Sequence, residues 1–110
     1  MEKRWSDRRE LRLDVDVIRQ GETVFTCLSR DVGLGGAFIM LSARDRVDKD
    51  AEVELTFHLI VTQEKIKHTL RARVVRVADD GVGLKFHEFD TSVFRSLQQI
   101  MTYNGDERVH

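Results

Sequence analysis

The sequence predicts an all-β domain, a small antiparallel six-stranded β-barrel with one C-terminal α-helix. Three observations favour it: short stretches in which apolar and polar residues alternate, glycine-containing turns between them, and helical spacing near the C-terminus. The chain has 110 residues, of which 41% are hydrophobic, which suits one domain with a modest core. Because closing a sheet removes its exposed edges, we expect a barrel rather than an open sheet.

Three strands are expected in the first half of the chain. Apolar and polar residues alternate in the first, the second is rich in β-branched and apolar residues, and the third is a short apolar run. Their ranges are 12–20, 23–30 and 37–41. The first two are separated by a turn at Gly21. The last two are separated by Asp-Val-Gly-Leu-Gly-Gly at 31–36, the glycine-rich segment, which we interpret as a tight turn.

Three further strands and a helix are expected in the second half. The strands span 53–59, 65–78 and 82–86. An Asp-Gly pair at Asp80 and Gly81 predicts a hairpin turn between the last two. Apolar residues then recur at helical spacing from Val93 to Met101, and we expect this helix to close one end of the barrel.

Composition sets the expected organisation and compartment. We expect a flexible arginine-rich arm over 1–12, the barrel with its helix over 13–103, and a frayed tail over 104–110. The net charge of -1 disfavours a globally basic nucleic-acid binder. No stretch approaches the roughly 18 apolar residues of a membrane span, and the charged N-terminal residues do not resemble a signal peptide. The expected compartment is therefore the cytoplasm.

Catalytic and metal chemistry are not expected. The four histidines show no spacing that would bring two of them together as metal ligands. No Ser-His-Asp or Cys-His arrangement is present. Cys27 has no second cysteine to pair with and is interpreted as a small buried apolar residue. We therefore predict that the chain is not an enzyme and that it has no metal site and no cofactor.

Arg8, Arg9 and Arg12 place three guanidinium groups within five positions just before the first predicted strand. Guanidinium groups bind phosphate oxygens and the O6/N7 edge of guanine through paired hydrogen bonds, and their flat faces stack on bases. The cluster therefore suits a small anionic ligand that carries bases. A solvated charged leader would have the same composition, and this alternative stays open.

The glycine-rich segment is the second candidate. Glycines permit positive φ and close approach of a ligand, and successive N–H groups in such a turn form an anion-binding nest. Asp31 can accept hydrogen bonds from the N1–H and N2–H₂ groups of a guanine. A plain tight hairpin explains the glycines equally well. The segment is not a P-loop, because no Gly-Lys-Ser/Thr ending follows.

Together these features resemble the PilZ domain, the bacterial receptor module for cyclic di-GMP. The matching residues are Arg8 and Arg12 for R-x-x-x-R, then Asp31, Gly33 and Gly36 for D/N-x-S-x-x-G about twenty residues later. The strand at 73–76 and the segment at 81–86 are also similar to the family's, so the resemblance covers nearly the whole chain.

The resemblance implies a cyclic di-GMP site. In it, Arg8 and Arg12 would clamp guanine bases and phosphates, and Asp31 would hold a guanine edge. Gly36 would keep the turn tight enough for the ligand to approach. Arg9 would add a contact to a phosphate or a base.

Three positions qualify this prediction. Gly33 stands where the family has serine, and the lost hydrogen bond is worth about 1 kcal/mol if water replaces it. The site would be weakened and not abolished, because the backbone N–H of Gly33 is still offered to the ligand. Asp7 precedes the arginine motif, where a negative charge favours one bound ligand over an intercalated pair. Arg76 would lie against the second base, or it is simply an exposed charge on a strand.

The leading hypothesis is a cyclic di-GMP receptor in which the ligand orders the arm and changes the surface offered to a protein effector, in motility, biofilm formation or a related process. A second is a PilZ-like adaptor that has lost ligand binding, as Gly33 would allow. A third, a barrel that binds single-stranded nucleic acid, is disfavoured by the net charge and the few aromatic residues. We expect no nucleic acid polymer as a partner and no insertion into a membrane.

Overall fold

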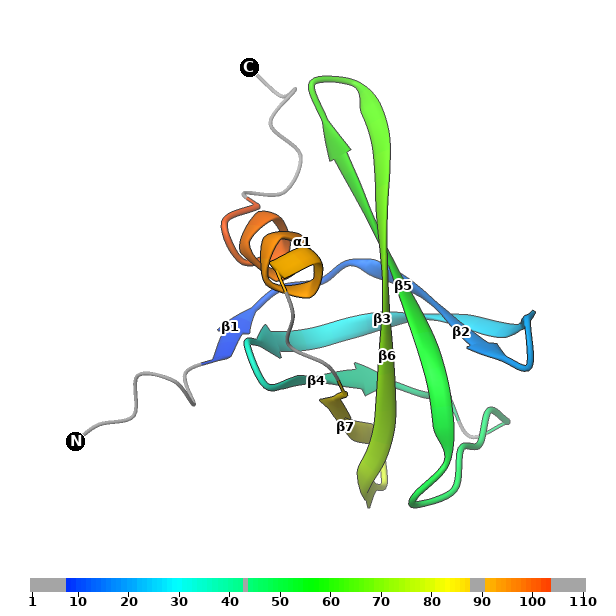
Figure 1. Ribbon diagram of the computed structural model, residues 1–110. Coiled ribbons are helices and arrows are strands. Elements are labelled where there is room, and N and C mark those ends of the chain that lie inside the picture. Colours follow the sequence, from blue (N-terminus) through cyan, green and yellow to red (C-terminus); the bar gives the residue numbers. More distant parts are fainter. Residues whose placement is uncertain (1–7, 43, 88–90, 104–110) are drawn as a thin grey trace.

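The computed structural model describes residues 8–42, 44–87 and 91–103. The elements in these ranges are β1 (Arg8–Glu10), β2 (Asp14–Arg19), β3 (Glu22–Gly33), β4 (Gly36–Met40), β5 (Glu52–Val61), β6 (Glu64–Ala78), β7 (Gly81–Phe86) and α1 (Thr91–Met101). Antiparallel pairing in the order β3-β2-β5-β6-β7-β4 closes six strands into a ring, because β4 also pairs with β3 (Figure 1). The predicted all-β class with one C-terminal helix is confirmed.

The described part of the chain has one strand more than the six predicted. β1 pairs with the C-terminal end of β3, and β2 pairs with the rest of the same strand. The hydroxyl of Ser29 on β3 joins the connection between them, donating to the carbonyl of Leu11 and accepting from the amide of Leu13. β1 forms because the end of β3 extends past β2 with backbone groups that need partners.

The arm expected over 1–12 therefore ends differently from the prediction. Its residues Arg8–Glu10 form a paired strand, so the ring with its flanking strand begins before the predicted boundary at residue 13. The first seven residues of the expected arm, and the expected frayed tail at 104–110, lie outside the described residues.

The turn in the glycine-rich segment is narrower than predicted. β3 continues through Gly33, and β4 begins at Gly36, so that only Leu34 and Gly35 connect the two strands. Among the described glycines only Gly21, in the β2–β3 turn, has positive φ, at 84°. The left-handed backbone expected for an anion-binding nest is therefore not found in this segment.

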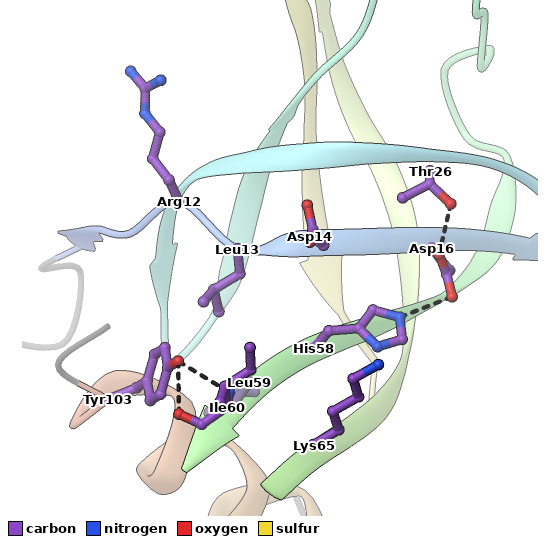
Figure 2. A pocket seen from close by; sticks show the side chains of 10 residues that line it. All are labelled: Arg12, Leu13, Asp14, Asp16, Thr26, His58, Leu59, Ile60, Lys65 and Tyr103. Atoms are coloured by element: carbon purple, nitrogen blue, oxygen red, sulfur yellow. Dashed lines mark hydrogen bonds and ion pairs between the residues drawn. The ribbon is translucent and has the colours of Figure 1, made fainter. Parts of the chain in front are cut away.

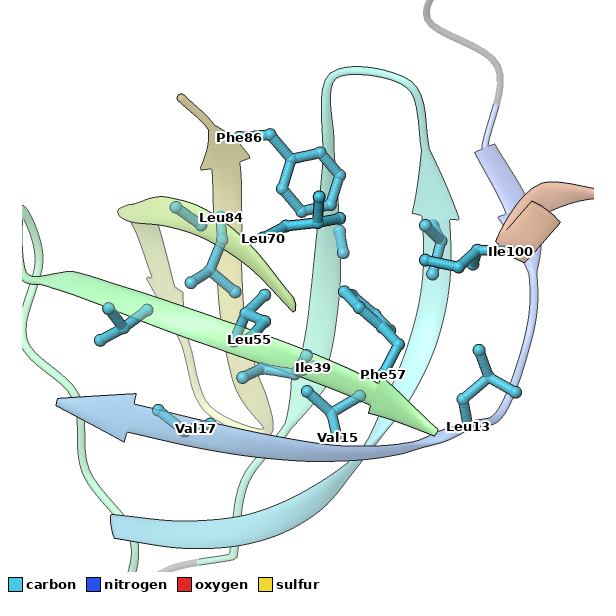
Figure 3. Close-up of a cluster of buried hydrophobic side chains, with 14 of the residues drawn as sticks. Leu13, Val15, Val17, Ile39, Leu55, Phe57, Leu70, Leu84, Phe86 and Ile100 are labelled. Atoms are coloured by element: carbon cyan, nitrogen blue, oxygen red, sulfur yellow. The ribbon is translucent and has the colours of Figure 1, made fainter. Parts of the chain in front are cut away.

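The hydrophobic core fills the inside of the ring (Figure 3). Apolar side chains from alternate positions of the strands meet there, as the period of two predicted. Leu97 and Ile100 of α1 join the same cluster and are fully buried, so the helix packs against the ring as expected. Cys27 is half-buried beside the core rather than fully buried. Burial nevertheless raises the pKa of its thiol to about 12, which keeps the thiol protonated near neutral pH.

Candidate ligand site on the outer face of the ring

Four strands carry a row of directly opposed residues across the outside of the ring, which we call the outer row. Its members, in order across the strands, are Asp31 (β3), Phe38 (β4), Gly83 (β7) and Arg76 (β6). Directly opposed residues of antiparallel strands point to the same face of a sheet. The neighbours of Phe38 along β4, Ala37 and Ile39, belong to the core inside the ring. The row therefore lies on the outside.

Two β-bulges place the ends of the outer row. The register shifts between Ser29 and Asp31 on β3, and between Val74 and Arg76 on β6. A bulge adds one residue to one strand and re-aims the side chains that follow it. Arg30 lies inside the first bulge, and its guanidinium lies with Asp31 over the outer row although the two residues are adjacent in sequence.

Two guanidinium groups bind the carboxylate of Asp31. Arg8 Nη1 donates to Oδ1 at 2.8 Å, and Arg30 Nε donates to Oδ2 at 2.9 Å. Arg8 lies opposite Gly33 in the β1–β3 pairing and reaches diagonally across to Asp31. Burial acts to raise the pKa of the Asp31 carboxyl, but the hydrogen bonds and charges of Arg8 and Arg30 together outweigh burial and lower the pKa.

Phe38 forms the centre of the outer row. Its ring is only 1% exposed although it lies outside the core, because guanidinium groups cover it. The Cζ atom of Arg30 lies 3.9 Å from the ring centroid, and that of Arg76 lies 5.5 Å away. A Cβ atom at Gly81 would come within 2.1 Å of the Ile39 carbonyl oxygen and 2.6 Å of the Phe38 ring, so both the strand pairing and Phe38 require glycine there. The arrangement places two cations against one aromatic ring.

Arg30 and Phe38 were missed by the sequence analysis. The apolar run at 37–41 assigned Phe38 to an ordinary strand, and nothing in that run marked its side chain as facing outwards. The Arg-Asp pair at Arg30 and Asp31 was visible, but on a regular strand neighbouring side chains point to opposite faces. The bulge that brings them together has no clear sequence signal.

Arg9 lies elsewhere. Its Nη1 atom donates to the carbonyl of Met101, at 2.7 Å, and to the carbonyl of Tyr103. These carbonyls lie at the C-terminal end of α1, whose last turn has no basic residue of its own. Arg9 therefore supplies the positive charge that the helix end favours, and the predicted ligand contact would require these bonds to break.

Arg12 is not joined to Asp31 by any described hydrogen bond or ion pair. It is exposed, and the four-residue spacing lets its Cα atom lie up to about 13 Å from that of Arg8. Arg12 lines a cavity of about 640 Å³ together with Asp14, Asp16, residues of β3, β5 and β6, and Tyr103. Figure 2 shows the Arg12 side chain directed away from the other side chains there.

That cavity is poorly suited to a phosphate, because the acidic Asp14 and Asp16 offset the positive charges of Arg12 and Lys65. The Thr26 hydroxyl and the ring of His58 bind Asp16, at 2.7 and 2.9 Å, and lower the pKa of its carboxyl. Asp16 is therefore ionised near neutral pH. Of the three clustered arginines, the structure thus brings only Arg8 to Asp31.

The comparison with protein-family models matches residues 2–103 to the PilZ domain. The chain belongs to the PilZ domain family. PilZ domains are generally receptor or adaptor domains for cyclic di-GMP. A comparison with curated protein sequences finds no match.

Solved structures share the fold, and one of them is a PilZ domain. The PilZ domain of CeSA from a cellulose-synthesising bacterium superposes with a TM-score of 0.64 at 17% identity, over 87% of this chain and 96% of that one. The Bacillus subtilis inhibitor of motility MotI/DgrA gives a TM-score of 0.68 at 18% identity, over 86% of this chain but only 47% of its own length. An uncharacterised Legionella protein, Lpg0364, gives 0.55 at 13% identity, over 86% of this chain and 90% of that one.

The two glycines of this PilZ domain's second motif have different surroundings. A Cβ atom at Gly36 would lie 2.0 Å from the carbonyl oxygen of Leu84 on β7, so Gly36 is required by the close approach of two strands. Gly33 lies within β3, opposite Arg8 and two residues beyond Asp31. Because alternate residues share a face, a side chain at Gly33 would point towards Arg8 and Asp31.

Two further findings concern the described residues 8–42, 44–87 and 91–103. No group of three or more histidine, cysteine, aspartate or glutamate side chains is placed to hold a metal ion there. No helix in the same ranges has the length and apolar character that crossing a membrane requires.

Proposed function

We propose that this PilZ domain is a non-catalytic cyclic di-GMP receptor of the bacterial cytoplasm that binds its ligand on the outer row and signals to a protein effector. The observation that carries the proposal is the Asp31 carboxylate, held by Arg8 and Arg30 on the outer face beside the Phe38 ring and Arg76. Membership of the PilZ family supports the choice of ligand.

The charges around Asp31 suit an anionic ligand with guanine bases. Arg8, Arg30 and Arg76 supply three positive charges against the two negative charges of Asp31 and of Glu10, which pairs opposite Asp31 on β1. Guanidinium groups pair with phosphate oxygens, and each carboxylate oxygen keeps a lone pair for a guanine N–H. The guanidinium of Arg76, whose Cζ atom lies 5.5 Å from the Phe38 ring centroid, would stack on a second base. Arg12 would contact the same ligand only if the ligand extends from Arg8 to Arg12, over up to about 13 Å.

Signalling would follow from the position of Arg8. It lies on β1, the short strand outside the ring, so a ligand that binds Arg8 also acts on the segment expected to be an arm. A ligand shifts the conformation of this segment only if it binds one conformation of the segment more tightly than another. The effector would recognise the surface that results.

Isothermal titration with cyclic di-GMP tests the proposal. The wild type is expected to bind, and Arg8→Ala and Asp31→Ala are each expected to weaken binding at least tenfold, about 1.4 kcal/mol. Arg19→Ala is the matched control, because it removes an exposed arginine at the far end of β2. No heat at tens of micromolar wild-type protein would favour the adaptor without ligand binding. Binding unaffected by both substitutions would refute the residue assignment.

Gly33→Ser sharpens the same experiment. The serine restores the family's hydroxyl on the face shared with Arg8 and Asp31. One added hydrogen bond of about 1 kcal/mol is expected to tighten binding about fivefold. An unchanged affinity would show that the backbone at this position already supplies what the ligand needs.

A further inference from the structure

We infer that Arg30 is a positioning residue, which stacks on Phe38 and thereby fixes the Asp31 carboxylate in the orientation that distinguishes guanine from adenine. This inference rests on the proposed function and assigns to the same site the residue that sets its base preference.

Arg30 is held at two points. Its Nε atom donates to Asp31 Oδ2 at 2.9 Å, and its Cζ atom lies 3.9 Å from the centroid of the Phe38 ring. The first contact fixes an edge of the guanidinium, and the second fixes its plane. A flat group fixed at its edge and its face has little freedom left, although the side chain is 40% exposed.

Phe38 provides a rigid base for this stack. The ring is 1% exposed and lies over β7, where a Cβ atom at Gly81 would collide with it. The guanidinium of Arg76 lies at 5.5 Å on the same ring and makes no described contact with Asp31. Phe38 therefore packs on β7, Arg30 stacks on Phe38, and Arg30 in turn fixes the carboxylate of Asp31.

The orientation of the carboxylate matters because of the chemistry of the base edge. Guanine presents two parallel donors, N1–H and N2–H₂, which pair with the two oxygens of one carboxylate lying in the plane of the base. Adenine presents an acceptor at N1 beside its N6 donor. One oxygen of the same carboxylate would therefore face the N1 lone pair, and the two would repel each other. Discrimination thus depends on a fixed carboxylate plane. Arg8 holds only Oδ1, and it does so from the three-residue strand β1.

The test uses Arg30→Ala and Arg30→Lys in the whole chain, with two separate readouts. The first needs no ligand: a nuclear magnetic resonance titration of the Asp31 carboxyl carbon. Because the Arg30 hydrogen bond lowers the pKa of Asp31, the pKa is expected to rise in Arg30→Ala and to stay unchanged in Arg19→Ala. An unchanged pKa in Arg30→Ala would overturn the inference, whatever the protein binds.

The second readout is the ratio of affinities for cyclic di-GMP and cyclic di-AMP. Arg30→Ala is expected to reduce the preference of the wild type at least tenfold. Arg30→Lys is expected to do the same, because an ammonium group keeps the charge but lacks the flat face and the Nε edge. Full recovery of the preference by Arg30→Lys would show that charge alone acts and would overturn the positioning role.

Phe38→Leu tests the support beneath Arg30. Leucine keeps an apolar side chain against β7 but removes the aromatic face. The preference is expected to fall less than in Arg30→Ala, and the double variant is expected to lose no more than Arg30→Ala, because both changes act through one contact. Wild-type protein that binds neither nucleotide would refute the proposed function instead, while the Asp31 titration would still decide the role of Arg30.

Discussion

Arg8 and Arg9 are adjacent on β1, yet they serve two different regions of the molecule. Arg8 reaches Asp31 at the outer row, where its side chain is 41% exposed. Arg9 turns the other way and binds the carbonyls of Met101 and Tyr103 at the end of α1. Successive residues of a strand point to opposite faces, so a cluster of arginines in the sequence is divided between two sites.

The two contacts also differ in expected strength. The ion pair of Arg8 with Asp31 contributes about 0.5 kcal/mol to stability, because the Arg8 side chain is 41% exposed and water screens the pair. The part-buried hydrogen bonds from the Arg9 guanidinium to two backbone carbonyls are charge-assisted, and they cap the C-terminal end of α1. We therefore assign stability to Arg9 and, under the proposed function, ligand binding to Arg8.

The largest effect is expected for Arg9→Ala. Loss of the two bonds leaves the carbonyls at the end of α1 without their cation, and the free energy of unfolding is expected to fall by about 2 kcal/mol. Arg8→Ala is the matched control on the same strand and should cost about 0.5 kcal/mol. Urea denaturation followed by circular dichroism measures both. Equal losses in the two variants would contradict the division between the regions.

Tyr103→Phe is expected to have the next largest effect. The Tyr103 hydroxyl donates to the carbonyl of Ile60 and accepts from its amide, both at 3.0 Å. These backbone groups lie near the end of β5, beyond its last pairing with β2 at His58. Removing the hydroxyl leaves them without this partner and is expected to cost about 1 kcal/mol.

The double variant Arg9→Ala with Tyr103→Phe tests whether the stability losses of the two single variants are coupled. Arg9 binds the carbonyl of Tyr103, so the two substitutions should be less than additive in a double-mutant cycle. Full additivity would mean that Arg9 and Tyr103 hold the end of α1 independently. The same cycle between Arg8→Ala and Tyr103→Phe is expected to be additive, because these residues serve different regions.

Much of the fold could be predicted because it follows from local patterns. The period of two placed Val15 and Leu55 inside the ring, and helical spacing placed Leu97 and Ile100 against the core. The strand predicted over 65–78 closely matches β6. These patterns determine which face of an element is buried, and burial of that face accounts for the all-β ring with one helix.

The site was only partly predictable because it depends on breaks in those patterns. Asp31 and Arg8 were identified from spacing, and the structure joins them. Arg30 and Phe38 required knowledge of a bulge and of a cross-strand register, which are set by pairing between distant segments. Arg9 was assigned to the ligand because the sequence gives no sign that the helix end would lie beside β1.

The smallest effect is expected from a change in pH. The same change also separates the two regions most sharply, because only one of the two arginine contacts contains a titrating group. The folded-state pKa of Asp31 lies below its ordinary value of 3.8, so its ion pairs stabilise the fold above that value and are lost as pH falls through the folded-state pKa. The difference of about 0.5 kcal/mol between wild type and Arg8→Ala should therefore be present at pH 7 and shrink below pH 4. Backbone carbonyls do not titrate, so the loss in Arg9→Ala should be the same at both pH values. Urea denaturation at pH 7 and pH 3 measures both differences. A loss in Arg9→Ala that also shrank at pH 3 would show that Arg9 stabilises the fold through a carboxylate and not through the end of α1.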